Sequence, residues 1–129
     1  METPLKILAV DDDFINLKLI SSMLKRNPQV GQIVEATNGL DAINLLKTHK
    51  DIHLVLLDIK MPIMDGIEFL INTQSMYEFK NLPIIVLTTD ETRKYEAFDK
   101  GAFDFLVKPI REIELRSKIA RVYELYAGQ

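Results

Sequence analysis

Acidic, hydroxyl and ammonium side chains stand at the ends of four apolar runs in this sequence. In chain order these side chains belong to Asp11, Asp12, Asp13, Asp58, Thr88, Thr89 and Lys108. Carboxylates brought together repel one another unless a cation lies among them, and an all-oxygen ligand set favours Mg²⁺. A lysine and a hydroxyl beside such an ion suit the oxygens of a phosphoryl group. The pattern therefore indicates a divalent-metal site that binds a phosphoryl donor.

Asp58 is the predicted covalent acceptor of the phosphoryl group. The chain has no cysteine, and no serine is paired with either histidine, His49 or His53, in a recognisable pattern. A carboxylate remains, and aspartyl phosphate is a known type of enzyme intermediate. Asp58 stands alone at the end of a buried run, which makes it the best candidate.

Five short apolar runs predict the strands that position these side chains. The runs are Leu5–Val10, Gln32–Ala36, His53–Leu57, Ile84–Leu87 and Phe103–Val107. Residues with helical spacing lie between the runs or follow the last one, and examples are Leu17, Ile20, Leu24, Ile43, Leu46, Ile67, Leu70, Ile71, Leu115, Ile119, Val122 and Tyr126. Strands that alternate with helices predict an α/β fold, with a parallel sheet covered by helices on both faces.

The predicted sheet brings the chemical side chains together. Ligands of open α/β sheets bind beyond the carboxyl ends of the strands, where all these side chains fall. The second and fifth runs carry the polar residues Gln32, Glu35 and Asp104, which predicts that these two strands form the edges. Asp13 precedes the first helical pattern and is predicted to cap that helix.

Composition excludes several other classes of protein. A chain of 129 residues with 47% hydrophobic side chains fits one globular domain, which we place at residues 1–129. A net charge of −3 gives no general attraction for nucleic acid. The apolar runs are far shorter than the roughly 20 residues of a membrane helix, and the first residues lack signal-peptide character. We therefore expect a cytoplasmic protein that binds neither nucleic acid nor a membrane.

Four motifs together resemble the receiver domains of response regulators in two-component signalling. They are Val10-Asp11-Asp12, the segment LLDIKMPIMDG from Leu56 to Gly66, Leu87-Thr88, and Val107-Lys108-Pro109. Each motif alone is weak, but all occur in order and at strand ends. The resemblance implies a flavodoxin-like, doubly wound sheet of strand order 2-1-3-4-5.

The resemblance also implies a role for each site residue. Asp58 accepts a phosphoryl group from the phosphohistidine of a sensor histidine kinase or phosphotransfer protein. Mg²⁺ is bound by Asp12, Asp58 and the backbone carbonyl of Lys60, with assistance from Asp11. The phosphoryl oxygens are contacted by Thr88 and Lys108, Phe105 swings inward behind the threonine, and Lys108-Pro109 carries a cis peptide bond. Such a chain catalyses its own phosphorylation and dephosphorylation without turning over a separate substrate.

The output surface implied by the resemblance is the face made by the fourth helix, the fifth strand and the fifth helix. Phosphorylation there shifts a population of conformers and controls a partner or output domain. The candidate residues are Tyr95, Arg111, Arg116 and Tyr123. A homodimer through this face, the downstream target, and attachment to a longer regulator are left open.

One further pair flanks the site in sequence. Lys60 and Asp90 each lie two residues after a site residue, and we expect an ion pair between them across the mouth of the pocket. Thr89 is bulkier than the residue common at its position in the family, and this narrows access to the site. The two histidines are interpreted as surface residues.

Two other functions compete with the receiver. A phosphatase of the haloacid dehalogenase type would use Asp11 and Asp13, with Thr88 and Lys108 as its later motifs. That family needs a further acidic pair after the lysine, for which the chain offers only Glu112, Glu114 and Glu124. The second competitor is an interaction module that keeps the fold but does not depend on phosphorylation.

Overall fold

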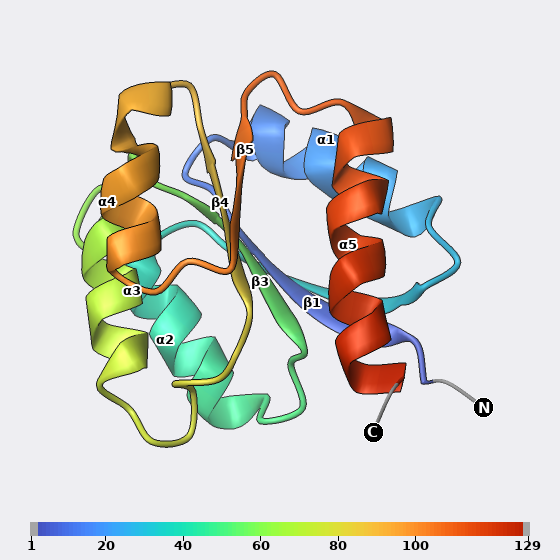
Figure 1. Ribbon diagram of the computed structural model, residues 1–129, viewed down its shortest axis with the longest axis horizontal. Coiled ribbons are helices and arrows are strands. Elements are labelled where there is room, and N and C mark those ends of the chain that lie inside the picture. The colour runs from blue at the N-terminus through green and yellow to red at the C-terminus, as the bar shows by residue number, and fades with distance from the viewer. Residues whose placement is uncertain (1–2, 128–129) are drawn as a thin grey trace.

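A sheet lies between two layers of helices in the computed structural model, which describes residues 3–127 (Figure 1). The strands are β1 (Leu5–Val10), β2 (Val30–Ala36), β3 (Leu54–Asp58), β4 (Ile84–Thr88) and β5 (Asp104–Val107). The helices are α1 (Phe14–Lys25), α2 (Gly39–Thr48), α3 (Gly66–Gln74), α4 (Lys94–Asp99) and α5 (Glu112–Ala127), with a 3₁₀ turn η1 (Glu91–Arg93) before α4. All strand pairs are parallel in the order β2-β1-β3-β4-β5, as predicted. The predicted domain limits, residues 1 and 129, lie outside the described residues.

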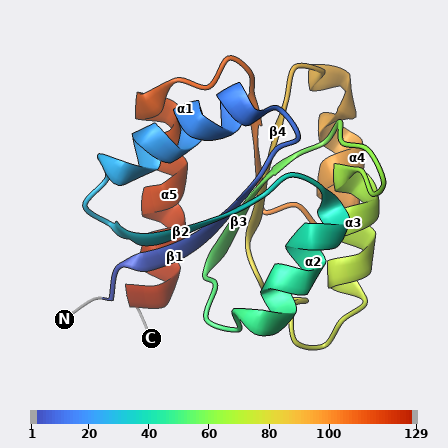
Figure 2. The ribbon, with the colours of Figure 1, turned by 180° about the vertical axis from the view of Figure 1, so that it is seen from behind.

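Alternate side chains of each central strand enter two different cores. On β1, Leu5, Ile7 and Ala9 pack with α1 and α5, whereas Leu8 and Val10 pack with α2, α3 and α4. This period of two follows from the pleat of a strand. Figures 1 and 2 show α1 and α5 on one side of the sheet and the other three helices opposite. Burial on both faces explains why the central strands are almost wholly apolar.

Side-chain caps begin the first three helices beside the carboxyl ends of the strands. Asp13 Oδ1 accepts hydrogen bonds from the backbone N–H groups of Ile15 and Asn16, at 2.9 and 3.3 Å, which confirms the predicted cap. Asn38 and Asp65 cap α2 and α3 in the same way. Such caps satisfy N–H groups that lack partners within the helix.

Two local predictions were wrong. β2 begins at Val30, not at Gln32, because Val30 pairs with Leu5 across an irregularity in the β1–β2 register. Ile71 is 49% exposed although we placed it on the apolar face of α3. The face that packs on the sheet carries Ile67 and Leu70, and Ile71 lies one residue, or about 100° of helical rotation, beyond it.

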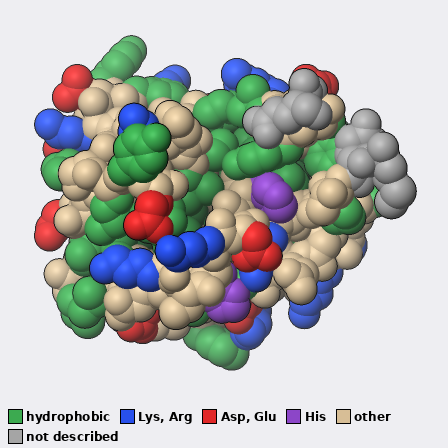
Figure 3. All heavy atoms as spheres, turned by 90° about the horizontal axis from the view of Figure 1, so that it is seen from below, with side chains coloured by type: hydrophobic (Ala, Val, Ile, Leu, Met, Phe, Trp, Pro, Cys, Tyr) green, Lys and Arg blue, Asp and Glu red, His purple; other side chains and the backbone are tan. Residues whose placement is uncertain are grey.

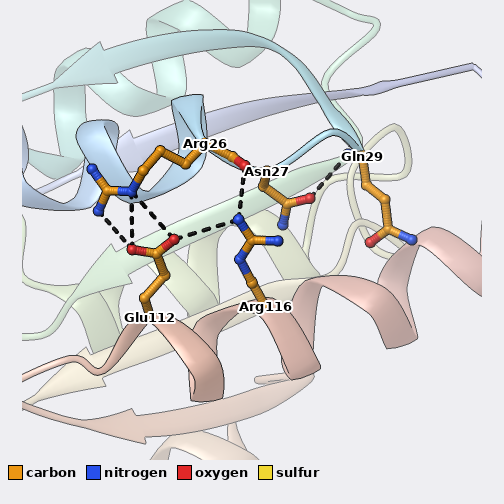
Figure 4. A network of polar contacts seen from close by, with 5 residues as sticks. All are labelled: Arg26, Asn27, Gln29, Glu112 and Arg116. Carbon is orange, nitrogen blue, oxygen red and sulfur yellow. Dashed lines mark hydrogen bonds and ion pairs between the residues drawn. The ribbon is translucent and has the colours of Figure 1, made fainter.

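A polar network joins the end of α1 to the start of α5 (Figure 4). Arg26 Nη2 lies 2.6 Å from Glu112 Oε1, and Arg116 donates to the Arg26 carbonyl at 2.7 Å. Arg116 therefore contacts the end of α1, and its place in the output surface stays a prediction. Within residues 3–127, none of the helices is long and apolar enough to cross a membrane.

Candidate active site

The carboxyl ends of β1, β3, β4 and β5 surround a pocket of about 310 Å³. Its lining consists of Asp11, Asp12, Asp13, Asn16, Asp58, Lys60, Thr88, Thr89 and Lys108. All of these except Asn16 were singled out from the sequence. Asn16 interrupts an otherwise apolar stretch of α1, and that polar position was the signal that could have identified it.

Three carboxylates form the acidic side of the pocket. One oxygen from each of Asp11, Asp12 and Asp58 lies within 4.8 Å of the others. The strand register explains this closeness, because Val10 is paired with Leu57 and the next residue of each strand carries an acid. Asp11 and Asp58 are buried, whereas Asp12 is exposed.

Lys108 reaches into this cluster from the end of β5. Its Nζ lies 2.8 Å from Asp11 Oδ2 and 3.3 Å from Asp58 Oδ1. Burial alone lowers the pKa of Lys108, but the hydrogen bond to Asp11 and the charges of both carboxylates outweigh it and raise that pKa. Lys108 is therefore held as an ammonium group beside Asp58. Its pairing with Asp11 was not predicted from the sequence.

The carboxyl group of Asp58 is poised between its two protonation states near neutral pH. Burial raises the pKa of Asp58 to about 6, with Lys108 opposing this rise and Asp11 and Asp12 adding to it. Loss of water disfavours the charged form, and so do the neighbouring negative charges. A cation bound among the carboxylates would favour the ionised form.

The donor set fits Mg²⁺. The ammonium of Lys108 offsets only one of the three carboxylate charges, so the ionised cluster keeps an excess of negative charge. Oxygen ligands at a partly open pocket suit an ion that retains some of its water. An acidic triad of this kind is typical of the Mg²⁺ sites of receiver domains.

Thr88 and Phe105 lie on adjacent strands behind the pocket. Thr88 is buried at the end of β4, and its Oγ1 accepts a hydrogen bond from the Asp90 N–H at 3.1 Å. Phe105 is paired with Val86 in the sheet and packs into the core beneath α2, α3 and α4. The structure thus places the aromatic ring inside the molecule, with 7% of it exposed.

The loop between β3 and α3 is tightly constrained. A Cβ on Gly66 would lie 2.8 Å from the backbone of Asp58 and Ile59, so only glycine allows α3 to start so near Asp58. Ile63 has a φ of 71°, and the Met64 N–H donates to the Pro62 carbonyl at 2.8 Å across it. A branched residue rarely adopts this left-handed turn.

The expected ion pair between Lys60 and Asp90 does not form in the part of the chain that the structure describes. The Asp90 carboxylate instead accepts hydrogen bonds from the backbone N–H and the hydroxyl of Thr92, and it caps η1. These hydrogen bonds are the main cause of the lowered pKa of Asp90, and the charge of Lys60 lowers it by a smaller amount. A local cap thus competes successfully with a longer-range pair of exposed side chains. Thr89 lines the pocket, as expected.

The acids needed by the phosphatase alternative lie outside the pocket. Glu112 pairs with Arg26 and Glu114 with Arg111, at 2.6 and 2.7 Å. Glu124 is an exposed residue near the end of α5. Among residues 3–127 the pocket lining therefore holds no second acidic pair after Lys108.

Comparisons with known proteins agree on one family. The model of the response regulator receiver domain matches residues 7–120. Chemotaxis protein CheY-3 of Vibrio cholerae is 34% identical over 122 residues, which cover 93% of this chain and 92% of that protein. The structure of the chemotaxis response regulator CheY4 of Vibrio cholerae superposes with a TM-score of 0.84 at 30% identity, covering 93% of this chain and 99% of that one.

Other relatives carry the same domain within longer chains. A protein-glutamate methylesterase/protein-glutamine glutaminase of Halalkalibacterium halodurans is 38% identical over 119 residues, covering 89% of this chain. This chain spans only 33% of that relative's length. The region matched by the family model includes the strand ends that carry the acidic pocket. The chain belongs to the response regulator receiver domain family.

Proposed function

We propose that Asp58 accepts a phosphoryl group from the phosphohistidine of a histidine kinase or phosphotransfer protein, and that this modification changes the surface near α4, β5 and α5. Receiver domains in general partner with histidine kinases. The observation that carries the proposal is the setting of Asp58. Its buried carboxylate lies 3.3 Å from the ammonium of Lys108, in a pocket that is also lined by three further acids and by Thr88.

The chemistry is a transfer between two nucleophiles. An oxygen of Asp58 forms a bond to phosphorus while the bond from phosphorus to the imidazole nitrogen breaks. The electron pair stays on the imidazole, which takes up a proton. Lys108 and the Thr88 hydroxyl supply positive charge and a hydrogen bond to the phosphoryl oxygens, where charge must be stabilised during transfer.

Asp11, Asp12, Asp58 and the carbonyl of Lys60 are the residues that would hold Mg²⁺. Bound there, Mg²⁺ supplies positive charge to the phosphoryl oxygens. Asp11 is already fixed in place, because its Oδ1 accepts the Asp13 N–H at 2.9 Å. Its other oxygen is 2.8 Å from Lys108, so Asp11 also orients the ammonium group beside the acceptor.

The rim of the pocket suits a protein donor. Phe14 and Ile15 begin α1 beside the acids and are 66% and 70% exposed, and Ile63 beyond β3 is 74% exposed. Large apolar side chains gathered around a charged pocket are typical of surfaces that bind another protein. We infer that the donor contacts this rim while its phosphoryl group enters the pocket.

The proposed output is a change in two neighbouring strands. Thr88 and Lys108 end β4 and β5, so contacts to a new phosphoryl group pull on both. Phe105 lies inside the core, and we propose a second population in which its ring turns outward. On the surface nearby, Tyr95 is 82% exposed and Val107 is 38% exposed. Phosphorylation would favour one population and so alter what this surface binds.

The test is incubation with acetyl phosphate or phosphoramidate and Mg²⁺, followed by measurement of intact mass. We expect one base-labile phosphoryl adduct on the wild-type chain. EDTA and the variant Asp58→Asn should each abolish it. Asp99→Asn, at an exposed acid in the last turn of α4, is the matched control and should retain it.

Two results would reject the proposal. An adduct that persists in Asp58→Asn but not in Asp11→Asn would favour the phosphatase alternative. No adduct on a folded wild-type chain with Mg²⁺ present would favour the interaction module that does not use phosphorylation.

A further inference from the structure

Both histidines of the chain accept hydrogen bonds from one residue, Lys6, at the end of the sheet opposite the acidic pocket. The Lys6 backbone N–H donates to His53 Nδ1 at 2.9 Å, and the Lys6 ammonium lies 3.0 Å from His49 Nδ1. An ammonium group can only donate, so His49 Nδ1 is the acceptor. Neither ring can carry a proton on Nδ1 while these contacts exist. Figure 3 shows this face, where histidine side chains lie among acidic and basic ones.

His53 also holds the last turn of α5. Its carbonyl accepts a hydrogen bond from the Tyr126 hydroxyl at 2.7 Å. The two rings meet edge to face, with centroids 4.7 Å apart at 75°. The His53 N–H donates to the Lys6 carbonyl at 2.9 Å and extends the pairing of β1 with β3. His53 therefore connects the start of the sheet to the end of α5.

We propose that Lys6, His49, His53 and Tyr126 form a proton-sensitive latch, which holds the last turn of α5 on the sheet and releases it when His53 becomes protonated. A protonated imidazole carries hydrogen on both nitrogens, so His53 could no longer accept the Lys6 N–H. That half-buried N–H would lose its partner, which disfavours the closed arrangement.

The charged and titratable groups of the latch come from several different elements. Lys6 approaches from β1, His49 from the end of α2, Asp51 from the following loop and Tyr126 from α5. The Lys6 ammonium lies 2.9 Å from Asp51 Oδ1, and this hydrogen bond lowers the pKa of Asp51. Burial raises the pKa of Tyr126, so its hydroxyl stays protonated. Between about pH 5 and pH 8, protonation of His53 is the change that would remove the acceptor of the Lys6 N–H.

The direction of the pH effect follows from the burial of His53. Burial lowers its pKa, and the nearby charge of Asp51 opposes this only in part. The unfolded chain therefore takes up the proton more readily than the closed latch. The latch is fully formed above the ordinary histidine pKa of about 6.5 and is lost as the pH falls through the lower value of the folded state.

Amide hydrogen exchange of the whole chain, resolved by NMR, tests the proposal at about pH 7.5 and about pH 5.5. The measured quantities are the protection factors of the Lys6 amide and of the amides of residues 124–127, which already correct for intrinsic exchange. Each protection factor is divided by the protection factor of the buried Ile119 amide in the middle of α5. A change in global stability, including one caused by titration of Asp58, alters the protection of all these amides by the same factor. Such a change therefore cancels in the ratio. We expect the ratio to fall about two- to tenfold at the lower pH, as for the loss of one hydrogen bond.

Three variants separate the latch from general acid sensitivity. His53→Asn keeps an acceptor oxygen near the Nδ1 position but does not titrate, so the ratio should lose its pH dependence. Tyr126→Phe removes the hydroxyl and should lower protection of the last turn even at the higher pH. Tyr77→Phe, at an 85% exposed tyrosine that is not one of the four latch residues, makes the same chemical change and should have no effect.

A constant ratio in the wild type would overturn the proposal, and so would an unchanged acid response in His53→Asn. If His53→Asn does not fold, the exchange ratios of the wild type and of Tyr126→Phe still test the proposal. In the wild type the NMR signals of the His53 and Tyr126 rings must shift with one common midpoint, and separate midpoints contradict the latch.

Discussion

The buried carboxyl group of Asp58 makes the metal-free protein lose stability as the pH rises. Its pKa is about 6 in the folded chain, against an ordinary value of 3.8. Between these two values the folded state binds more protons than the unfolded state. The stabilisation is therefore present at low pH and is lost as the pH rises through the folded value, by about 1–3 kcal/mol.

The variant Asp58→Asn isolates this contribution from the other carboxylates. Asparagine stays neutral, so in EDTA the variant should be more stable than the wild type at about pH 7 and nearly equal to it at about pH 4. Urea unfolding at several pH values measures the difference between the two chains. A difference that does not change with pH would show that Asp58 is not perturbed by its surroundings.

Lys108 stabilises two acids that would otherwise face each other. Its side chain is only 12% exposed, and its Nζ contacts both Asp11 and Asp58. We expect Lys108→Met to lose about 2–4 kcal/mol of unfolding free energy in EDTA, because buried charges are left unpaired. Mg²⁺ should restore part of this loss by replacing the missing positive charge.

An exposed ion pair provides the control for Lys108. Lys50 lies 3.3 Å from Glu78, and both side chains are well exposed. Lys50→Met should cost less than about 1 kcal/mol, since water screens such pairs. Urea unfolding of both variants gives the comparison, and equal losses would mean that burial does not strengthen the pairing of Lys108.

At the scale of elements, the loop from β3 to α3 stores strain beside the acceptor. Ile63 is branched, has a φ of 71° and is 74% exposed, so little burial compensates for its conformation. Ile63→Gly should stabilise the chain by about 1 kcal/mol relative to Ile63→Ala, which shortens the side chain but keeps the steric penalty. Urea unfolding measures the stabilities of the two variants, and equal stabilities of Ile63→Gly and Ile63→Ala would show that the turn is not strained.

The elements differ in how well the sequence predicts them. Short, almost wholly apolar runs located β1 and β4 closely, because strands buried on both faces tolerate few polar residues. The start of β2 depends on the pairing of Val30 with Leu5, which no local pattern reveals. The strained turn at Ile63 and the ion pair of Lys108 with Asp11 depend on how the finished fold places distant residues. The place of Asp58 in the acidic pocket was predictable, because Asp58 ends a buried strand.

At the scale of the whole molecule, the parallel sheet explains why one rim carries the chemistry. Every strand runs in the same direction, so β1, β3, β4 and β5 all deliver their last residues to one side. The opposite rim gathers the histidines against α5. The two ends of the molecule thus hold different titratable groups, joined by strands of only 4–6 residues in this part of the sheet.

Because the acidic cluster exists only when β1 and β3 are paired, Mg²⁺ should stabilise the entire fold. A ligand that binds only the folded chain adds about 2.7 kcal/mol at one hundred times its dissociation constant. Thermal unfolding with increasing MgCl₂, against NaCl of equal ionic strength, measures this gain. Asp12→Asn removes an exposed ligand and should abolish most of it, whereas Asp99→Asn should keep it. An equal gain in NaCl, or an undiminished gain in Asp12→Asn, would show that stabilisation arises from general screening and not from a site at the acidic pocket.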